Sequence, residues 1–481
     1  MVIPLNVLQT NNLSLLHKHI GKINSLNINS SKIITVLLIT VLSLFQTGLG
    51  AAVLAVNSSD NLQQKLDSAL TGDTLFLQAG EYRGNFVIRH SITLTGKENA
   101  TINAQGKGHA LRLLTSNISI KNLNIINWGA DLTAQNAAIY VGQKSDHLII
   151  KNNNLKGDGF GIWVQDSNQV LIANNHIQGN PKLRSADRGN GIQLSVVTNA
   201  DVVGNDVSFT RDGLYIISSQ NSLLRNNTLH DLRYGIHYMY SYDNKVLNNL
   251  TYNTRAGYAL MSSKNLQVSG NESRDSEDYG MLLNFITSST IDHNSIKDVW
   301  TKPEHKVLGR QGKGLFVYNS AYNTISYNKI DTAEIGIHLT AGSENSKLFG
   351  NSFINNPVQV KYVSNKKQEW SQDGRGNYWS NYLGWDLDNN GTGDTPFEPN
   401  DGIDKLIWQY PEAKVLLDSP AVLLLRWIQK QFPVLKPAGI KDSFPLMLPP
   451  NIETKAEIKA ETKPETKVDT KGEATTLNST H

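Results

Sequence analysis

Short runs of alternating apolar and polar residues fill most of the chain between residues 56 and 365, separated by turns rich in Asn and Gly. An Asn recurs at one place in the pattern apolar-x-apolar-x-x-Asn-x-apolar, mostly every 22 or 23 residues. A column of Gly has the same period and the same two longer intervals, which contain insertions at residues 180–190 and 300–312. The Asn column is Asn153, Asn175, Asn205, Asn227, Asn249, Asn271, Asn294, Asn328 and Asn351, and the Gly column is Gly161, Gly191, Gly213, Gly235, Gly257, Gly280, Gly314 and Gly336.

Two independent columns with one period predict a solenoid with units of about 22 residues. Short strands joined by Asn and Gly turns favour an all-β, right-handed parallel β-helix over residues 56–365. We expect the Asn amides to stack in a ladder from rung to rung, and Gly to supply turn angles that other residues resist. Leucine-rich repeats have a similar length, but the regular Leu framework that they need is missing.

The Gly column sets the register of one strand in each unit. The first and third residues after each Gly are apolar, so we expect them to point into the core. The second and fourth must then face outward, and they are rich in aromatic residues, Met and His. The second positions are Trp163, Gln193, Tyr215, His237, Ala259, Leu282, Phe316 and His338, and the fourth are Gln165, Ser195, Ile217, Met239, Met261, Asn284, Tyr318 and Thr340. An exposed apolar face of this kind predicts a binding surface.

Three soft or borderline metal ligands fall together in this register. Met239 and Met261 occupy the same outward position on consecutive rungs, and His237 shares their face two residues before Met239. Met281 breaks the apparent series because it belongs to a core column, and His338 lies several rungs away. Thioethers select Cu(I), and an imidazole completes a site for it. The pattern therefore predicts a copper site at His237, Met239 and Met261; the alternative is that the two Met residues are apolar filler.

After residue 365 the repeat ends, and a second candidate site appears. Asp386, Asp388, Asn390 and Asp394 match positions 1, 3, 5 and 9 of a calcium-binding loop. The twelfth position, normally Glu, is Phe397. The segment predicts a Ca²⁺ site, with a turn rich in Asp, Asn and Gly as the alternative.

Residues 366–450 as a whole are predicted to form a C-terminal extension that caps the open end of the solenoid and serves for docking. Residues 420–432 are apolar and lie between Pro420 and Pro433, which indicates a short helix. This helix either covers the last rung or docks on a membrane partner. The Pro-rich run that follows is typical of an extended arm.

Composition and the chain ends narrow the function. The chain of 481 residues has no Cys and a net charge of +3, which excludes thiolate metal sites and argues against a nucleic-acid partner. Residues 33–45 are mostly apolar, follow Lys32 and precede small residues, so residues 1–55 are predicted to be a signal peptide for export to the periplasm, with an uncleaved anchor as the alternative. Acids and lysines recurring every four residues predict that residues 451–481 are a disordered, charged tail.

Four segments carry a resemblance to a known family: residues 233–244 (RYGIHYMYSYDN), 376–394, 410–437 and 441–447 (KDSFPLM). In these segments the chain resembles the NosD family of nitrous-oxide reductase maturation proteins. The resemblance implies a non-enzymatic periplasmic protein attached to an ABC transporter made of an ATPase and a membrane permease. It also implies a role in assembling the copper centre of nitrous-oxide reductase, with Cu(I) supplied by a small copper-chaperone lipoprotein.

Two other functions remain open from the residues alone. The fold is also used by polysaccharide lyases, epimerases and carbohydrate-binding proteins, and outward aromatic residues such as Trp163, Tyr215, Phe316 and Tyr318 suit stacking on sugars. The outward columns carry no Asp, Glu, Arg or Lys, so an enzyme of this class would lack its base and its charge neutraliser there. Acidic and basic residues on other faces, including Asp275, Asp278 and Arg211, keep this alternative open. A docking platform without metal is the third possibility.

Overall fold

The structure of the protein is a computed structural model that describes residues 51–307, 310–364, 366–416, 419–432 and 439–451. The predicted signal peptide, apart from residues 51–55, and the charged tail, apart from residue 451, lie outside the described residues, as does most of the Pro-rich arm. The chain divides into two units, Met1–Ala52 and Val53–His481. The described strands and helices all belong to the second unit.

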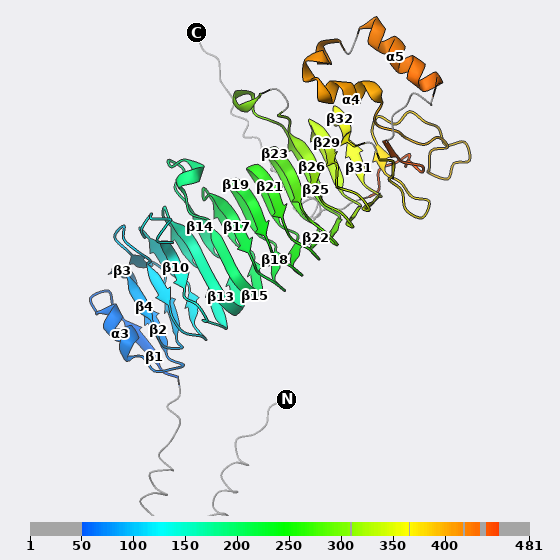
Figure 1. Cartoon of the computed structure of the whole chain (residues 1–481). Coiled ribbons are helices and arrows are strands. Elements are labelled where there is room, and N and C mark those ends of the chain that lie inside the picture. Colours follow the sequence, from blue (N-terminus) through cyan, green and yellow to red (C-terminus); the bar gives the residue numbers. More distant parts are fainter. Residues whose placement is uncertain (1–50, 308–309, 365, 417–418, 433–438, 452–481) are drawn as a thin grey trace, which may run out of the picture. The chain divides into compact units, whose positions relative to one another are not determined.

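The predicted parallel β-helix is confirmed: the unit is a parallel β-solenoid of about 14 turns of about 23 residues each. Successive rungs stack side by side along the solenoid (Figure 1), and the strand pairings of the described rungs are parallel. The first strand begins at Val53, within the segment predicted as a leader.

The strands before the first insertion are β1 (Val53–Val56), β2 (Thr74–Leu77), β3 (Gly80–Arg83), β4 (Phe86–Ile88), β5 (Thr93–Gly96), β6 (Ala100–Asn103), β7 (Leu111–Leu113), β8 (Ser119–Lys121), β9 (Asn124–Ile126), β10 (Ala137–Val141), β11 (Leu148–Lys151), β12 (Asn154–Lys156), β13 (Phe160–Ala173) and β14 (His176–Gln178). Between the two insertions lie β15 (Ile192–Val203), β16 (Asp206–Ser208), β17 (Asp212–Ile217), β18 (Leu223–Arg225), β19 (Thr228–Met239), β20 (Lys245–Leu247), β21 (Leu250–Met261), β22 (Gln267–Ser269), β23 (Glu272–Asn284), β24 (Thr290–Asp292) and β25 (Ser295–Val299). The later strands are β26 (Lys313–Tyr318), β27 (Thr324–Ser326), β28 (Lys329–Ala333), β29 (Ile335–Thr340), β30 (Lys347–Phe349), β31 (Ser352–Ile354), β32 (Val358–Val363), β33 (Gln368–Glu369), β34 (Tyr378–Trp379) and β35 (Ile440–Lys441).

The core lies inside the rungs, where the Gly register places it. Ile236, Tyr238, Tyr258, Leu260 and Met281, from the first and third columns, are all buried. Met281 is therefore a core residue, as its register predicts. Stacked apolar columns of this kind bury a continuous core that no single rung could form alone.

The Asn ladder is confirmed and is longer than the repeat indicates. Asn227 donates its amide Nδ2 to Oδ1 of Asn249 at 2.9 Å, and Asn249 donates to Asn271 at 3.0 Å in the same way. The series continues to Asn377, whose backbone N–H donates to Oδ2 of Asp442 at 2.8 Å. Asp442 thus ends the ladder from a segment 65 residues further along the chain, and burial raises the pKa of its carboxyl to about 6.

The Gly column has a different cause from the one predicted. Its members do not have positive φ angles, so they are not needed for an unusual turn. Instead, a Cβ on Gly235 would lie 2.6 Å from the carbonyl oxygen of Gly257, and one on Gly257 would lie 2.7 Å from that of Gly280. Adjacent rungs therefore approach so closely at this corner that no side chain fits between them.

Helices occur at both ends of the described solenoid. Helix α3 (Leu62–Ser68) buries Leu62 and Leu66 over the first rungs. The predicted C-terminal helix is confirmed as α5 (Pro420–Gln431), which begins after the N-cap Ser419, and α4 (Gly402–Gln409) precedes it. Short 3₁₀ helices are η1 (Ser185–Asp187), η2 (Pro303–His305) and η3 (Pro411–Leu416). In the part of the chain that is described, no helix has the length and apolar character needed to cross a bilayer.

Candidate metal-binding face

The three predicted copper ligands lie on two neighbouring strands. Met239 on β19 pairs directly with Met261 on β21, and His237 precedes Met239 by two residues on the same strand. Parallel strands are about 4.8 Å apart, and residues two apart share a face. The register thus brings one imidazole and two thioethers to one patch, which we call the Met/His face.

The Met/His face is less open than the sequence pattern suggests. His237 is only 8% exposed, and Met239 and Met261 are half-buried. The ring of Tyr215, its partner on the preceding rung, lies 4.6 Å from the His237 ring, and Tyr234 contacts that ring edge-on at 5.2 Å. The prediction of a fully exposed outer column is wrong, because large side chains on successive rungs cover one another.

Asp212 orients the imidazole of His237. Its Oδ2 lies 2.9 Å from Nδ1 of His237, and Arg233 donates Nε and Nη2 to the same carboxylate at 2.8 and 2.7 Å. Burial alone would raise the pKa of Asp212, but the hydrogen bonds from His237 and Arg233 outweigh it and hold the pKa below its usual value. The ionised carboxylate only accepts, so Nδ1 carries a proton, and in the neutral imidazole Nε2 is then the nitrogen with the lone pair.

Nε2 of His237 is therefore the nitrogen available to a metal. It is buried and has no hydrogen-bond partner among the described residues. A carboxylate that holds the other ring nitrogen is the usual companion of a metal-ligating histidine, because it fixes both the tautomer and the ring orientation. The donor set of this face thus fits a soft monovalent metal.

Tyr215 also holds one of the two thioethers in place. Its hydroxyl donates to Sδ of Met239 at 3.3 Å. Burial raises the pKa of Tyr215, and the negative charge of Asp212 adds to this effect, so the phenol stays a donor at neutral pH. A thioether sulfur has two lone pairs, so one remains free for a metal while the other is held.

Asp212, Arg233 and Tyr234 lie one or two residues before the Gly column and are not among the predicted site residues. The outward columns carry no carboxylate and no guanidinium, as the register indicates, but Asp212 and Arg233 lie outside those columns and meet beside His237. The same Gly register would have found them if it had been extended backward, since Asp212, Tyr234 and Ala256 pair in one column.

The described part of the insertion at residues 300–312 is held by ion pairs to rungs that follow those of Met239 and Met261. His305 and Arg310 bind Glu277 at 2.5 and 3.1 Å, and Lys306 binds Glu334 at 3.3 Å. These contacts tie the loop to the rungs of β23 and β29 rather than to the methionines.

The predicted Ca²⁺ ligands form a hydrogen-bonded turn. Asp386 accepts from the backbone of Asn390 at 3.0 Å, Asn390 donates its amide to Asp388 at 2.8 Å, and Asp394 accepts from the backbone of Leu387 at 2.8 Å. Among the described residues there is no group of three or more His, Asp or Glu arranged to hold a metal ion. The Ca²⁺ site therefore stays a prediction from the sequence.

Fold and site together define a parallel β-solenoid with a soft-metal donor set on one flank. Residues 173–384, which contain the Met/His face, match the family model of the periplasmic copper-binding protein NosD. The chain is 46% identical over 410 residues to a probable ABC transporter binding protein NosD from Pseudomonas aeruginosa, covering 85% of this chain and 95% of that one. The relative from Stutzerimonas stutzeri is 46% identical over 374 residues, covering 77% and 86%. The chain belongs to the NosD family, and the family resemblance inferred from the sequence is confirmed.

Solved structures support the fold alone. The Streptococcus pneumoniae surface protein and adhesin PfbA aligns with a TM-score of 0.52 at 13% identity, covering 64% of this chain and 100% of that one. The Dettilon tailspike protein gp208 aligns with a TM-score of 0.50 at 14% identity, covering 66% and 70%. The periplasmic location predicted from the leader agrees with the family.

Proposed function

We propose that this periplasmic protein binds Cu(I) through Nε2 of His237 and the sulfur atoms of Met239 and Met261, and presents it during assembly of the copper centre of nitrous-oxide reductase. The observation that carries this proposal is the buried, unpartnered Nε2 of His237, oriented by Asp212 beside two adjacent thioethers. A copper-chaperone lipoprotein supplies the ion, and the protein works with the permease and ATPase of an ABC transporter. Relatives named as probable ABC transporter binding proteins support this partnership.

The donor set suits transfer of copper. Thioethers and imidazole favour Cu(I) without the tight hold of thiolates, and the chain has no Cys that would retain the ion. Half-buried methionines leave one side of the patch open to a partner. Both features favour binding that a second protein can reverse.

Competition titration with Cu(I) under anaerobic conditions tests the site on the full chain. We expect the double variant Met239→Leu, Met261→Leu to bind Cu(I) at least about a hundredfold more weakly, because two of three ligands are lost while side-chain volume is kept. The double variant Met281→Leu, Met447→Leu is the matched control and should bind as the wild type does. Equal affinity in both double variants would reject the site.

A carbohydrate-active enzyme is the second candidate, and one observation favours it. Asp212, Arg233, His237 and Tyr215 bring a carboxylate, a guanidinium, an imidazole and a phenol together, which are groups that β-elimination or epimerisation of uronates requires. The carboxylate is already shared between Arg233 and His237, which leaves no free base there. Turnover of a uronate polymer by the wild-type chain, lost in Asp212→Asn, would establish this function instead.

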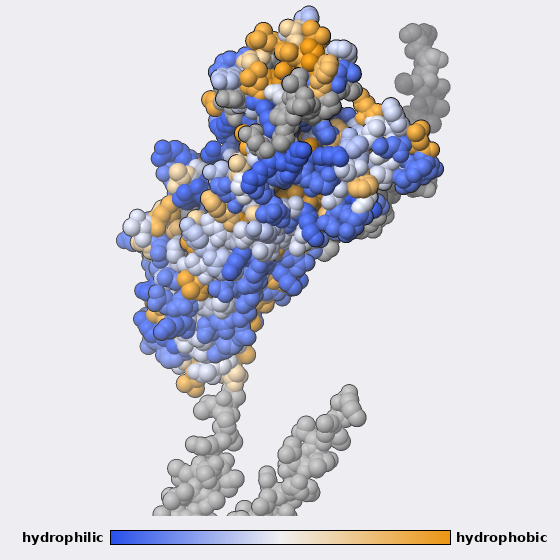
Figure 2. Space-filling view, turned by 45° about the vertical axis from the view of Figure 1, so that its right-hand side comes forward, coloured by the Kyte–Doolittle hydropathy of each residue, from blue (hydrophilic) through white to orange (hydrophobic). Residues whose placement is uncertain are grey.

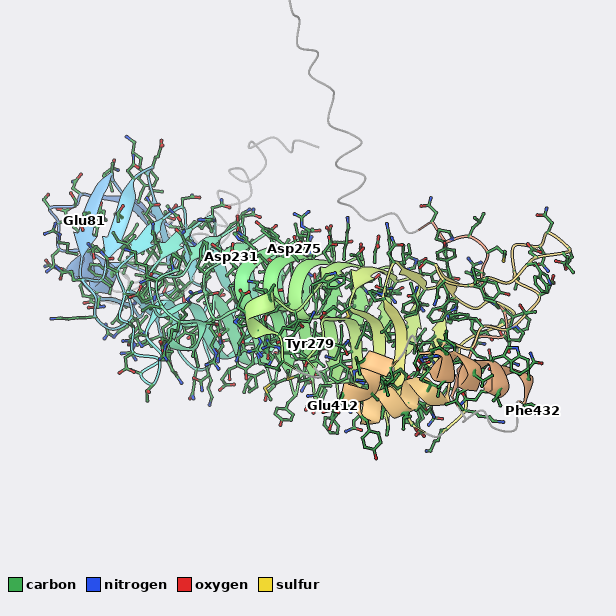
Figure 3. All side chains as sticks on the ribbon, turned by 90° about the horizontal axis from the view of Figure 1, so that it is seen from above. Glu81, Asp231, Asp275, Tyr279, Glu412 and Phe432 are labelled. Carbon is green, nitrogen blue, oxygen red and sulfur yellow. The ribbon has the colours of Figure 1, made fainter. Side chains whose placement is uncertain are left out.

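We further propose that α5 docks on the membrane permease. Arg426 binds Asp404 at 2.9 Å and also pairs with Asp401, so one side of α5 is held against α4. Leu423, Leu424, Leu425 and Trp427 are all about half exposed on the same helix. Figure 2 shows hydrophobic surface gathered over this C-terminal helical region, and Phe432 lies at the end of α5 (Figure 3).

Co-purification with the permease and ATPase tests this docking surface. We expect Leu424→Asp with Trp427→Asp to reduce recovery of the transporter at least about tenfold, because two desolvated apolar contacts are replaced by charges. Leu383→Asp makes the same apolar-to-charged change at a residue that is 91% exposed elsewhere in the C-terminal region, and it should leave recovery unchanged. Full recovery with the double variant would exclude α5 as the docking element.

A further inference from the structure

A row of arginines runs along the solenoid beside the Met/His face. Arg211, Arg233 and Arg255 each lie two residues before a Gly of the repeat, and the backbone of Arg233 donates to the carbonyl oxygen of Arg211 at 2.8 Å. All three line a groove of about 590 Å³, which Pro181 and Lys302 from the two insertions also line. We call this the arginine groove.

The three arginines differ in whether an acidic side chain forms an ion pair with them. Arg233 pairs with Asp212, and Arg255 pairs with Asp278 at 2.5 Å. Nε of Arg211 is buried without a hydrogen-bond partner among the described residues, and no carboxylate there lies within ion-pair distance of this side chain. A guanidinium whose Nε–H is buried without an acceptor at the wall of a groove is stabilised when an anion binds there and accepts from it.

The other groups of the arginine groove leave it basic. Its two carboxylates are already engaged: Asp231 lies 2.7 Å from Nδ1 of His230, and Glu277 binds both His305 and Arg310. Arg188 donates only to backbone carbonyls, and Lys302 is exposed. Because the chain as a whole is nearly neutral, this basic strip is a local feature.

The length of the arginine groove favours an extended ligand. Its lining residues run from Arg188 to Glu277. Arg188 lies one rung before Arg211, because the backbone N–H of Arg211 donates to the carbonyl oxygen of the neighbouring Gly189. These residues cross four rung spacings, or about 19 Å at about 4.8 Å each. One oxyanion would fill a small part of this length, whereas about six residues of an extended peptide would span it.

The arginine groove adjoins the Met/His face through a shared carboxylate. Asp212 binds Arg233, which lines the groove, and His237, which we assign to the metal, with the same oxygen. We propose that the groove binds an extended acidic segment of the protein that delivers copper to this site or takes it away. Acidic side chains of that segment pair with Arg211, Arg188 and Lys302. The identity of this partner as a copper donor or acceptor rests on the proposed function, whereas the recognition of acidic peptide does not.

Binding of a labelled oligoglutamate peptide of about six residues to the full chain tests the proposal. We expect binding that weakens as salt is added, and no binding of oligoglutamine of the same length. The variant Arg211→Gln, Lys302→Gln should bind the peptide about tenfold more weakly or worse, since two charge-assisted contacts are lost. Arg83→Gln with Lys97→Gln removes the same charge from exposed sites in the first turns and should bind as the wild type does.

Competitors and a copper titration separate the possible outcomes. Displacement of the peptide by sulfate at an equal concentration of anion would overturn the proposal in favour of a small oxyanion site, and tighter binding of an oligogalacturonate would overturn it in favour of a saccharide. Equal peptide affinity in the two double variants would also overturn it. Loss of peptide binding with unchanged Cu(I) affinity in Arg211→Gln, Lys302→Gln supports the groove independently of the metal site. Failure of the methionine titration leaves the peptide result standing and rejects only the copper assignment.

Discussion

Replacing Asp212 by Asn is expected to lower the free energy of unfolding by about 3 kcal/mol, because one partner of a buried ion pair is removed. The side chain of Asp212 is 2% exposed, and its two oxygens accept from Arg233 and His237. An amide in its place turns a donor toward one of these donors, whichever way it is rotated, and leaves the Arg233 charge uncompensated. Chemical denaturation of the full chain measures the loss.

The same variant is expected to weaken Cu(I) binding by about ten- to a hundredfold, because the carboxylate no longer holds the proton on Nδ1 of His237. Asp201 is the matched control. It makes a similar two-pronged pair with Arg225, with a shorter contact of 3.0 Å, but both side chains are more than one-third exposed. Asp201→Asn should cost less than about 1 kcal/mol and leave copper binding unchanged. Wild-type copper affinity in Asp212→Asn would show that Asp212 does not orient a metal ligand.

Replacing Asn153 by Ala is expected to cost about 3 kcal/mol, since several buried backbone and amide groups lose their partners together. Asn153 donates to the carbonyl oxygen of Ile120 at 3.1 Å and to Asn175 at 2.9 Å, and accepts from the backbone of Leu123 at 3.1 Å. The measurement is the denaturant midpoint of the full chain. Protection of amides against hydrogen exchange reports whether the loss is confined to neighbouring rungs, as expected for a solenoid.

The adjacent Asn154 is the control for this substitution. It is exposed, and its amide makes one contact of 3.3 Å with Asn124 on the same face. Asn154→Ala should shift stability by less than about 0.5 kcal/mol. Similar losses in both variants would mean that the ladder hydrogen bonds contribute little beyond the general preference for Asn in this turn.

Much of the fold could be predicted because the Asn and Gly columns show which residues occupy equivalent positions in successive rungs. Two columns with one period define the rung, and alternation around Gly235 or Gly257 sorts core residues such as Tyr238 and Leu260 from outward ones. The physical cause of the Gly column was missed, because close approach of neighbouring rungs is not visible within one rung. The end of the Asn ladder was missed for a related reason: Asp442 reaches it from outside the repeat.

The candidate site was predictable only in part. The sequence by itself determined that Met239 and Met261 are neighbours and that His237 shares their face. In a parallel solenoid, residues one period apart lie next to each other on adjacent rungs. Only the tertiary structure decided that His237 is buried between two tyrosines and that Asp212 holds its Nδ1. It also decided that Nε of Arg211, at the wall of a basic groove, has no hydrogen-bond partner among the described residues. Periodicity specifies which backbone positions stack. The direction of side chains around a corner of the rung, and what covers them, depends on packing between rungs that no single repeat contains.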